Sequence, residues 1–298
     1  MSKSSLFSSG NRRDRSPKLR IASRSSSHVE LLPPVIPGSL ALRGELWKRV
    51  RQLDLLLVAF RVCDGAAIGS ILKQPSEILQ EKLFKLRHPL GEIVTRRWVA
   101  NSPQLIRSGE EESALNDYHR GIVNSLHVSD PAEFLAVIKN LYAAVSAEHP
   151  SFRRQEKRSS PDVNGFAWVF PPAAAIEPSL RCLHSMLFRS TLKSRILDAI
   201  VTYAVITWIH GFQDGNGRIS RILFNSILRE GGMPAVNYIP LKEFNIISLG
   251  GHEIRLRATH LSGEFDEIIE YFIYLLEAYA EIVCGPLVKS INPKSNPI

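Results

Sequence analysis

The sequence predicts a mainly α-helical protein with one short β-hairpin. Apolar residues recur at helical spacing in several long segments, and glycines or prolines separate these segments. Residues 163–172 instead combine a glycine turn with alternating bulky side chains and end at Pro-Pro, which is typical of a short hairpin strand. With 298 residues, 44% hydrophobic and 22% charged, the chain has the composition of a globular protein with one large or two modest domains.

The first 38 residues are expected to form a disordered, basic, Ser-rich tail followed by a Pro-rich linker. Residues 1–28 contain seven Lys and Arg against one Asp, a net charge of +6 within a total of +8 for the chain. They have almost no apolar clusters, so they cannot bury enough surface to fold. The basic character therefore belongs to the tail, and a nucleic-acid-binding function, which rests on the tail alone, is disfavoured for the rest of the chain.

Residues 39–113 are predicted to be an N-terminal helical region. Apolar side chains fall at helical spacing in residues 40–61, and residues 75–86 look like a second helix. Residues 96–112, with a Ser-Gly-Glu-Glu-Glu run, are predicted to form a loop.

Residues 114–283 are predicted to hold the catalytic core, and residues 284–298 a C-terminal tail. Beside the hairpin, the core is expected to contain a helix at 115–126 and another at 176–187. Residues 193–209 are apolar on nearly every face, which indicates a buried helix. A long terminal helix is expected at 265–283.

The most informative segment is His-Gly-Phe-Gln-Asp-Gly-Asn-Gly-Arg-Ile-Ser-Arg at residues 210–221. It follows a predicted helix and leads into a second one that ends near Gly231-Gly232, so it forms a polar turn and a helix N-terminus. Amides at a helix N-terminus suit an anion such as phosphate, and Gly215 and Gly217 let the backbone approach it closely. Arg218 and Arg221 share one helical face and can both reach phosphate oxygens.

Two further side chains of this segment suit phosphate chemistry. Asp214 is a hard oxygen ligand for a Mg²⁺ ion that bridges phosphates. His210 has a side chain whose ordinary pKa lies near neutrality, so it is a candidate to accept a proton from an attacking hydroxyl. Other phosphate or metal motifs do not fit, because the chain lacks the P-loop pattern Gly-x-x-x-x-Gly-Lys-Ser/Thr and the third glycine of a dinucleotide-binding site. An EF-hand would place Phe212 and Leu223 at the first and last positions of the loop, where neither can bind calcium.

Residues 210–221 resemble the motif of the Fic (Fic/Doc) family, His-Pro-Phe-x-Asp/Glu-Gly-Asn-Gly-Arg-x-x-Arg. Every position matches except the second, where this chain has Gly211 in place of proline. The resemblance implies a Fic-type helical bundle with a β-hairpin flap before the motif, and membership of the protein adenylyltransferase (AMPylator) branch. Such an enzyme transfers AMP from ATP to a Ser, Thr or Tyr hydroxyl of a target protein and releases pyrophosphate.

The resemblance also implies a role for each matching residue. His210 would be the general base, and Asp214 would hold Mg²⁺. The backbone of Gly215, Asn216 and Gly217 would cradle the α- and β-phosphates of ATP, helped by Arg218. Arg221 would face the γ-phosphate, and Phe212 would be a buried anchor.

The flap implied by the resemblance falls on five consecutive residues. A target protein would dock there as an extended segment that pairs with the flap strand. These docking residues are Asn164, Gly165, Phe166, Ala167 and Trp168.

Gly211 leaves two alternatives open, because glycine loosens the turn that proline would stiffen. The chain could use another nucleotide or phosphate donor, or it could be a catalytically weak nucleotide- or protein-binding module. Fic-like kinases carry Ala-Asn-Lys where this chain has Gly215-Asn216-Gly217, and that difference favours nucleotidyl transfer.

The inhibitory pattern of many Fic proteins, Ser/Thr-x-x-x-Glu-Gly/Asn, has no match in this chain. Residues 65–70 read Gly-Ala-Ala-Ile-Gly-Ser, and Ser26 and Glu30 have the right spacing but are followed by Leu31. The enzyme is therefore expected either to be unrestrained or to be held by a separate antitoxin-like partner, and it is a candidate for self-modification.

Location is predicted from composition. No apolar run approaches the roughly 18–20 residues that a membrane span requires. Cys63, Cys182 and Cys284 lie far apart in apolar contexts and fit buried thiols in a reducing compartment, which favours the cytoplasm. The Ser-rich, acid-poor N-terminus also resembles that of secreted bacterial effectors.

Overall fold

Helices dominate the structure, a computed structural model that describes residues 21–24, 28–60, 68, 71–72, 74–90, 115, 126, 128–146, 149–159, 167–234 and 237–285. The helices are α1 (Gly44–Leu56), η1 (Leu57–Ala59), α3 (Glu77–Phe84), α6 (Pro131–Val145), η4 (Ala173–Ala175), α7 (Ile176–Phe188), α8 (Arg195–Ile209), α9 (Asn216–Glu230), α10 (Leu241–Ile247), α11 (Gly251–Ser262) and α12 (Asp266–Cys284). The strands are β1 (Ile21–Arg24), β2 (His28–Leu31) and β3 (Ala167–Val169). The predicted mainly α fold class is confirmed.

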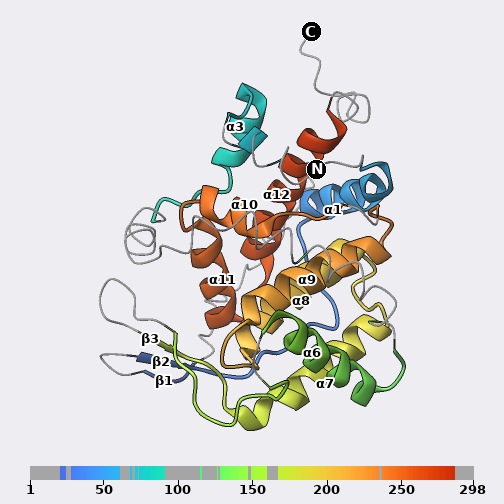
Figure 1. The fold of residues 1–298 in the computed structure, drawn as a ribbon. Helices are drawn as coiled ribbons and strands as arrows, with labels where there is room; N and C mark the ends of the chain where they lie inside the picture. The colour runs from blue at the N-terminus through green and yellow to red at the C-terminus, as the bar shows by residue number, and fades with distance from the viewer. Residues whose placement is uncertain are drawn as a thin grey trace, which may run out of the picture.

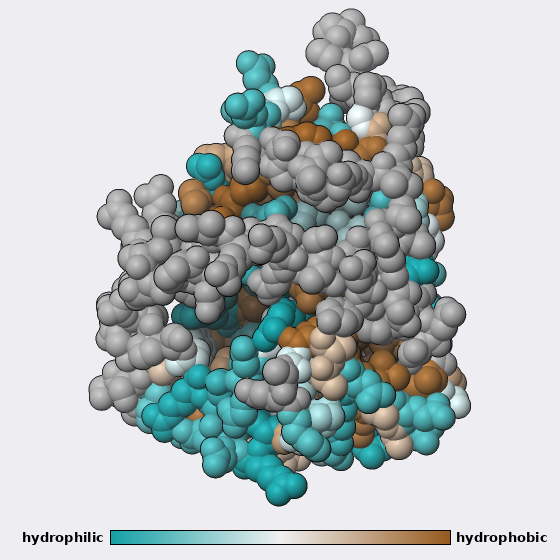
Figure 2. Space-filling model, in the orientation of Figure 1, coloured by the Kyte–Doolittle hydropathy of each residue, from teal (hydrophilic) through white to brown (hydrophobic). Residues whose placement is uncertain are grey.

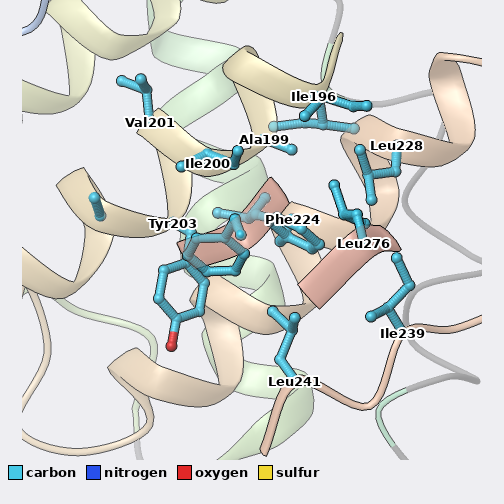
Figure 3. Close-up of a cluster of buried hydrophobic side chains, with 14 of the residues drawn as sticks. Ile196, Ala199, Ile200, Val201, Tyr203, Phe224, Leu228, Ile239, Leu241 and Leu276 are labelled. Atoms are coloured by element: carbon cyan, nitrogen blue, oxygen red, sulfur yellow. The ribbon is translucent and has the colours of Figure 1, made fainter. Parts of the chain in front are cut away.

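Helices α8 and α9 pack against each other at the centre, and the other helices surround them (Figure 1). Almost every residue of α8 is buried, as its uniformly apolar sequence predicts. Ile196 and Tyr203 from α8, Phe224 and Leu228 from α9, and Leu276 from α12 belong to one apolar cluster (Figure 3). This packing holds the turn between α8 and α9 on a rigid support.

Side-chain caps define where several helices begin. The Ser194 hydroxyl accepts a hydrogen bond from Leu197 N–H at 3.2 Å, which starts α8. The Asp130 carboxylate accepts from Ala132 N–H at 2.8 Å, and Pro131 occupies the first turn of α6. Helix α6, which the sequence analysis left unassigned, packs on α7 and α9.

The face of the molecule around α6 and α7 mixes hydrophilic and hydrophobic residues (Figure 2). Lys139 of α6 pairs with Glu177 of α7 at 3.8 Å across this face. Both helices turn apolar side chains inward, where Phe134 and Leu183 are fully buried. They form the outer wall beside the turn between α8 and α9.

The small sheet lies at one side of the bundle in the order β1-β2-β3 (Figure 1). Strands β1 and β2 are antiparallel, whereas β2 runs parallel to β3 and pairs His28 with Ala167 and Glu30 with Val169. The other side of β3 is antiparallel to residues 157–159, because Ser159 N–H donates to Trp168 carbonyl at 2.8 Å and Phe170 N–H donates to Lys157 carbonyl at 2.9 Å. Residues 157–159 and β3 therefore face each other as the two sides of a hairpin, as predicted.

The prediction that residues 1–28 are disordered is wrong for residues 21–24 and for His28. They form β1 and the start of β2, because Val29 and Leu31 are buried against Trp208 of α8. The indole N–H of Trp208 also donates to Leu32 carbonyl at 3.0 Å. Long-range packing thus orders a segment that has too few apolar residues to fold alone.

Other expectations have mixed outcomes. Cys284 is buried as expected but Cys182 is exposed, because it lies on the outer face of α7. Cys63, the loop at 96–112, residues 1–20 and 286–298, and all of 115–126 except its two end residues lie outside the described residues. In the described part of the chain, no helix is long and apolar enough to cross a membrane.

Candidate active site

The turn between α8 and α9 is built on two residues with left-handed backbone conformation. His210 ends α8 with φ 48° and ψ 55°, and its N–H donates to Ile206 carbonyl at 3.2 Å. Gly215 precedes α9 with φ 78°, a conformation that glycine adopts without a steric penalty. The predicted helix boundaries on both sides of the motif are therefore correct. Of the three glycines in the motif, Gly215 has a positive φ, whereas Gly211 and Gly217 do not.

The side chain of Asn216 locks the turn from inside. Its Oδ1 accepts from Phe212 N–H at 3.0 Å, and its Nδ2 donates to Phe212 carbonyl at 2.8 Å. Asn216 is 2% exposed, so both bonds are shielded from water. Sequence reasoning assigned Asn216 only a backbone role, whereas the structure gives its side chain a structural role as well.

Phe212 anchors the turn in the core, as expected. Its ring is 3% exposed and stacks on Tyr142 of α6 with ring centroids 4.1 Å apart. Phe152 packs on the same ring at 5.2 Å. The turn is thus fixed by an aromatic cluster and by the Asn216 amide.

The N-terminus of α9 presents backbone donors. The first N–H donated within the helix is that of Ile219, to Gly215 carbonyl at 3.0 Å, so the N–H groups of Asn216, Gly217 and Arg218 point out of the helix end. A Cβ added to Gly217 would lie 3.5 Å from a guanidinium nitrogen of Arg221, which places that side chain beside the same helix end. Amides and guanidinium together form a positive environment suited to phosphate.

Arg218 and Asp214 form an ion pair at the rim. The guanidinium Nη2 lies 3.2 Å from Asp214 Oδ2, and Nη1 donates to Val145 carbonyl. The Asp214 side chain is 81% exposed. A metal held there would take one protein carboxylate and would need phosphate oxygens and water as its other ligands, which is the usual arrangement for Mg²⁺.

No ready-made metal cage accompanies Asp214. Among the described residues, no group of three or more His, Cys, Asp or Glu side chains could hold a metal ion.

His210 is held as a neutral imidazole. Burial, together with the charges of Lys157 and Arg153, lowers the pKa of His210 to about 4. A hydrogen bond to the Thr207 backbone and the charge of Asp214 act in the opposite direction. The ring stacks on Phe170, with centroids 3.9 Å apart and planes 11° from parallel. A neutral, oriented imidazole is the form that can accept a proton.

One residue that sequence reasoning did not single out contacts the histidine directly. Arg153 is 4% exposed, and its Nε donates to His210 carbonyl at 2.7 Å. Arg153 lies 57 positions before His210, so no local spacing links the two, and only the fold brings them together.

The predicted docking residues are only partly described. Asn164, Gly165 and Phe166 lie outside the described residues, whereas Ala167 and Trp168 belong to β3. The Trp168 ring faces α11, where the Arg257 guanidinium lies 5.3 Å from its centroid. Since β2 and residues 157–159 flank β3 on both sides, β3 is an interior strand.

The match to known proteins agrees with this geometry. A sequence model of the Fic/DOC family matches residues 130–228. The chain carries a Fic domain. Within this domain lie α6, α7, α8, most of α9 and the turn that holds His210, Asp214 and Arg218.

The chain is similar to solved structures, and the first of them, with a TM-score above 0.5, has the same fold. A Fic family protein from Desulfovibrio desulfuricans G20 aligns over 87% of this chain and 77% of its own, with a TM-score of 0.52 and 16% sequence identity. A segment of Fic-1 from C. elegans aligns over 83% of this chain and 74% of its own, with a TM-score of 0.47 and 18% identity. IbpAFic2, solved covalently tethered to Cdc42, aligns over 80% and 72%, with a TM-score of 0.43 and 15% identity. No curated protein matches the sequence.

Proposed function

We propose that this protein is a protein adenylyltransferase, which transfers AMP from ATP to a Ser, Thr or Tyr hydroxyl of a target protein and releases pyrophosphate. The observation that carries the proposal is the juxtaposition of a neutral His210 with the N-terminus of α9 across one rigid turn. The proposal is supported by the resemblance to Fic proteins, most of which catalyse this reaction, because His210, Asp214 and Arg218 match the family motif within residues 130–228.

The chemistry needs one base and one anion site. The target hydroxyl oxygen attacks the α-phosphorus, and His210 takes the hydroxyl proton as the new P–O bond forms. The bond from the α-phosphorus to the bridging oxygen breaks, and pyrophosphate leaves. Backbone amides of Asn216 and Gly217, with Arg218 and Arg221, would stabilise the charge on the phosphates.

Asp214 would hold the Mg²⁺ that accompanies ATP. The bound ion would neutralise charge on the α- and β-phosphates. The exposed carboxylate of Asp214 lies 3.2 Å from the Arg218 guanidinium. Binding of the metal to Asp214 would therefore break this ion pair.

Target docking by strand pairing would use the outer edge of residues 157–159. Arg158 lies opposite Val169 at the bridge between the two strands. Because the neighbouring residues on either side bond to β3, the backbone N–H and carbonyl of Arg158 point away from it. Arg158→Pro, which removes that N–H, would then weaken modification of the target and leave self-modification unchanged.

Residues 114–283 are the proposed catalytic unit, since α10, α11 and α12 complete the core around α8 and α9. The pattern Ser/Thr-x-x-x-Glu-Gly/Asn has no match in the sequence, so the enzyme would be either unrestrained or held by a separate antitoxin-like partner. A cytoplasmic location is proposed because the three cysteines lie far apart in the sequence in apolar contexts, which fits thiols of a reducing compartment.

The test is transfer of label from α-labelled ATP with Mg²⁺ into protein, with and without cell extract. His210→Ala is compared with His149→Ala, a matched change at an exposed histidine. Label that depends on His210 supports the proposal, and label in the enzyme itself supports self-modification. Transfer of the γ-phosphate, or from a nucleotide other than ATP, supports the alternative donors, and ATP binding without transfer supports a binding module.

A further inference from the structure

A buried arginine outside the Fic motif holds the end of α8 where the candidate base lies. The Arg153 guanidinium donates through Nε to His210 carbonyl at 2.7 Å and through Nη2 to Ile209 carbonyl at 3.4 Å. Its backbone N–H donates to Gly211 carbonyl at 2.9 Å. Three consecutive carbonyls at the end of α8 and in the turn thus accept hydrogen bonds from one residue.

A buried guanidinium is costly unless its charge is compensated. Burial lowers the pKa of Arg153, and its guanidinium donates hydrogen bonds to backbone carbonyls. The last carbonyls of a helix lack intrahelical partners and carry partial negative charge, so they are suitable acceptors for a cation. The carbonyls at the end of α8 therefore compensate the buried charge of Arg153, and the hydrogen bonds from Arg153 hold that end of the helix in place.

The backbone at this point needs such a restraint. His210 has φ 48°, a left-handed conformation that is strained for a residue with a side chain and persists only where the surroundings enforce it. Gly211 follows directly, and glycine adds freedom where the family motif has proline. The bonds from Arg153 constrain the peptide groups on both sides of Gly211 Cα.

The same guanidinium also fixes the strand that covers the imidazole. Its Nη2 donates to Pro171 carbonyl, and Nη1 donates to Gln155 carbonyl at 2.9 Å. Phe170, next to Pro171, is the ring that stacks on His210. Arg153 thus holds the backbone of His210 directly and the ring of His210 indirectly, through Pro171 and Phe170.

We propose that Arg153 is a positioning residue, which holds His210 in its left-handed conformation beneath Phe170 and supplies the rigidity that Gly211 does not. The inference deepens the proposed transferase function and rests on it for its kinetic test. The structural part of the inference can be tested without turnover.

The kinetic test compares Arg153→Ala and Arg153→Lys with Arg154→Ala, a matched change at the adjacent exposed arginine. Displacement of a catalytic group by about 1 Å costs about 100-fold in rate, so Arg153→Ala is expected to lower kcat about 100-fold. The KM for ATP should stay within about twofold, because the N-terminus of α9 is held separately by Asn216 and Phe212. Arg153→Lys keeps the charge but not the planar guanidinium, so its kcat should lie between those of Arg153→Ala and the wild type. The kcat of Arg154→Ala should equal that of the wild type.

The second readout is the imidazole itself, followed by NMR with ¹³C-labelled histidine in folded protein. In Arg153→Ala, the His210 resonance should shift, and its titration should move upward from about 4 towards 6.5. The chemical shift of the exposed His149, which serves as the control, should not change. Unchanged His210 resonances in a folded Arg153→Ala, or equal losses in kcat for Arg153→Ala and Arg154→Ala, would overturn the proposal. If the wild type transfers no AMP and the His210 resonance still moves, the positioning role stands and the transferase function fails.

Discussion

The side chain of Asn216 provides the sharpest test of how the turn is held. Asn216→Ala removes two buried hydrogen bonds of 3.0 and 2.8 Å and leaves the N–H and carbonyl of Phe212 without these partners. An unsatisfied buried group costs about 1–3 kcal/mol, so the two together should lower the free energy of unfolding by about 3 kcal/mol. For a chain of this size, that corresponds to a Tm lower by roughly 6–12 °C. Transfer measured well below the new Tm should also fall by about 100-fold, because the turn that carries His210 loosens.

A matched asparagine separates the local effect from general destabilisation. Asn225 is equally buried in α9, where it donates to Arg221 and Ile239 carbonyls and accepts from Ile239 N–H at 2.7 Å. Asn225→Ala should lower Tm by a similar amount yet leave kcat within a fewfold of the wild type. The assay is thermal unfolding followed by circular dichroism, together with label transfer at 20 °C. An Asn216→Ala variant with wild-type Tm and rate, or one whose rate falls no more than that of Asn225→Ala, would refute the reasoning.

Three more predictions concern ionisable groups. Burial, helped by the charge of Asp198, raises the pKa of Glu230 from 4.5 to about 7, so the stability gained by its protonation is present below about pH 4.5 and lost as pH rises through 7. In urea unfolding, the free energy of unfolding of Glu230→Gln should exceed that of the wild type by about 3 kcal/mol at pH 8 and by about 1 kcal/mol or less at pH 5. A difference that does not depend on pH would contradict this. Since the pKa of His210 is about 4, kcat/KM should change less than about twofold between pH 8 and 5.5, whereas an ordinary histidine would lose about tenfold. Asp214→Ala should change the free energy of unfolding by less than about 1 kcal/mol, because the carboxylate is 81% exposed. In a titration of AMP transfer with Mg²⁺, the same variant should raise the half-saturating Mg²⁺ concentration by about tenfold or more. An unchanged Mg²⁺ requirement would show that Asp214 does not hold the metal.

Local signals made much of the candidate site predictable. The end of α8 at His210, the left-handed Gly215 and the start of α9 all depend on glycines and helical periodicity within about thirty residues of sequence. The burial of Phe212 followed from the Fic motif, and the structure confirms it.

What sequence reasoning missed depends on contacts between distant segments. Arg153 looked like one of two adjacent basic residues, and only its burial distinguishes it from Arg154. Strand β2 is short and follows a basic Ser-rich tail, so its ordering could not be read without the apolar cluster around Trp208. Such features require tertiary packing that overrides local composition.

The pairing of β2 with β3 sets the order of events when the chain is made. About 140 residues separate His28 from its partner Ala167, which at roughly 5–20 residues per second is a delay of roughly 7–30 s during synthesis. Throughout that interval β2 has neither β3 nor Trp208 to cover it, and pairing across so long a loop is intrinsically slow. The sheet beside His210 is therefore expected to be among the last parts of the molecule to form.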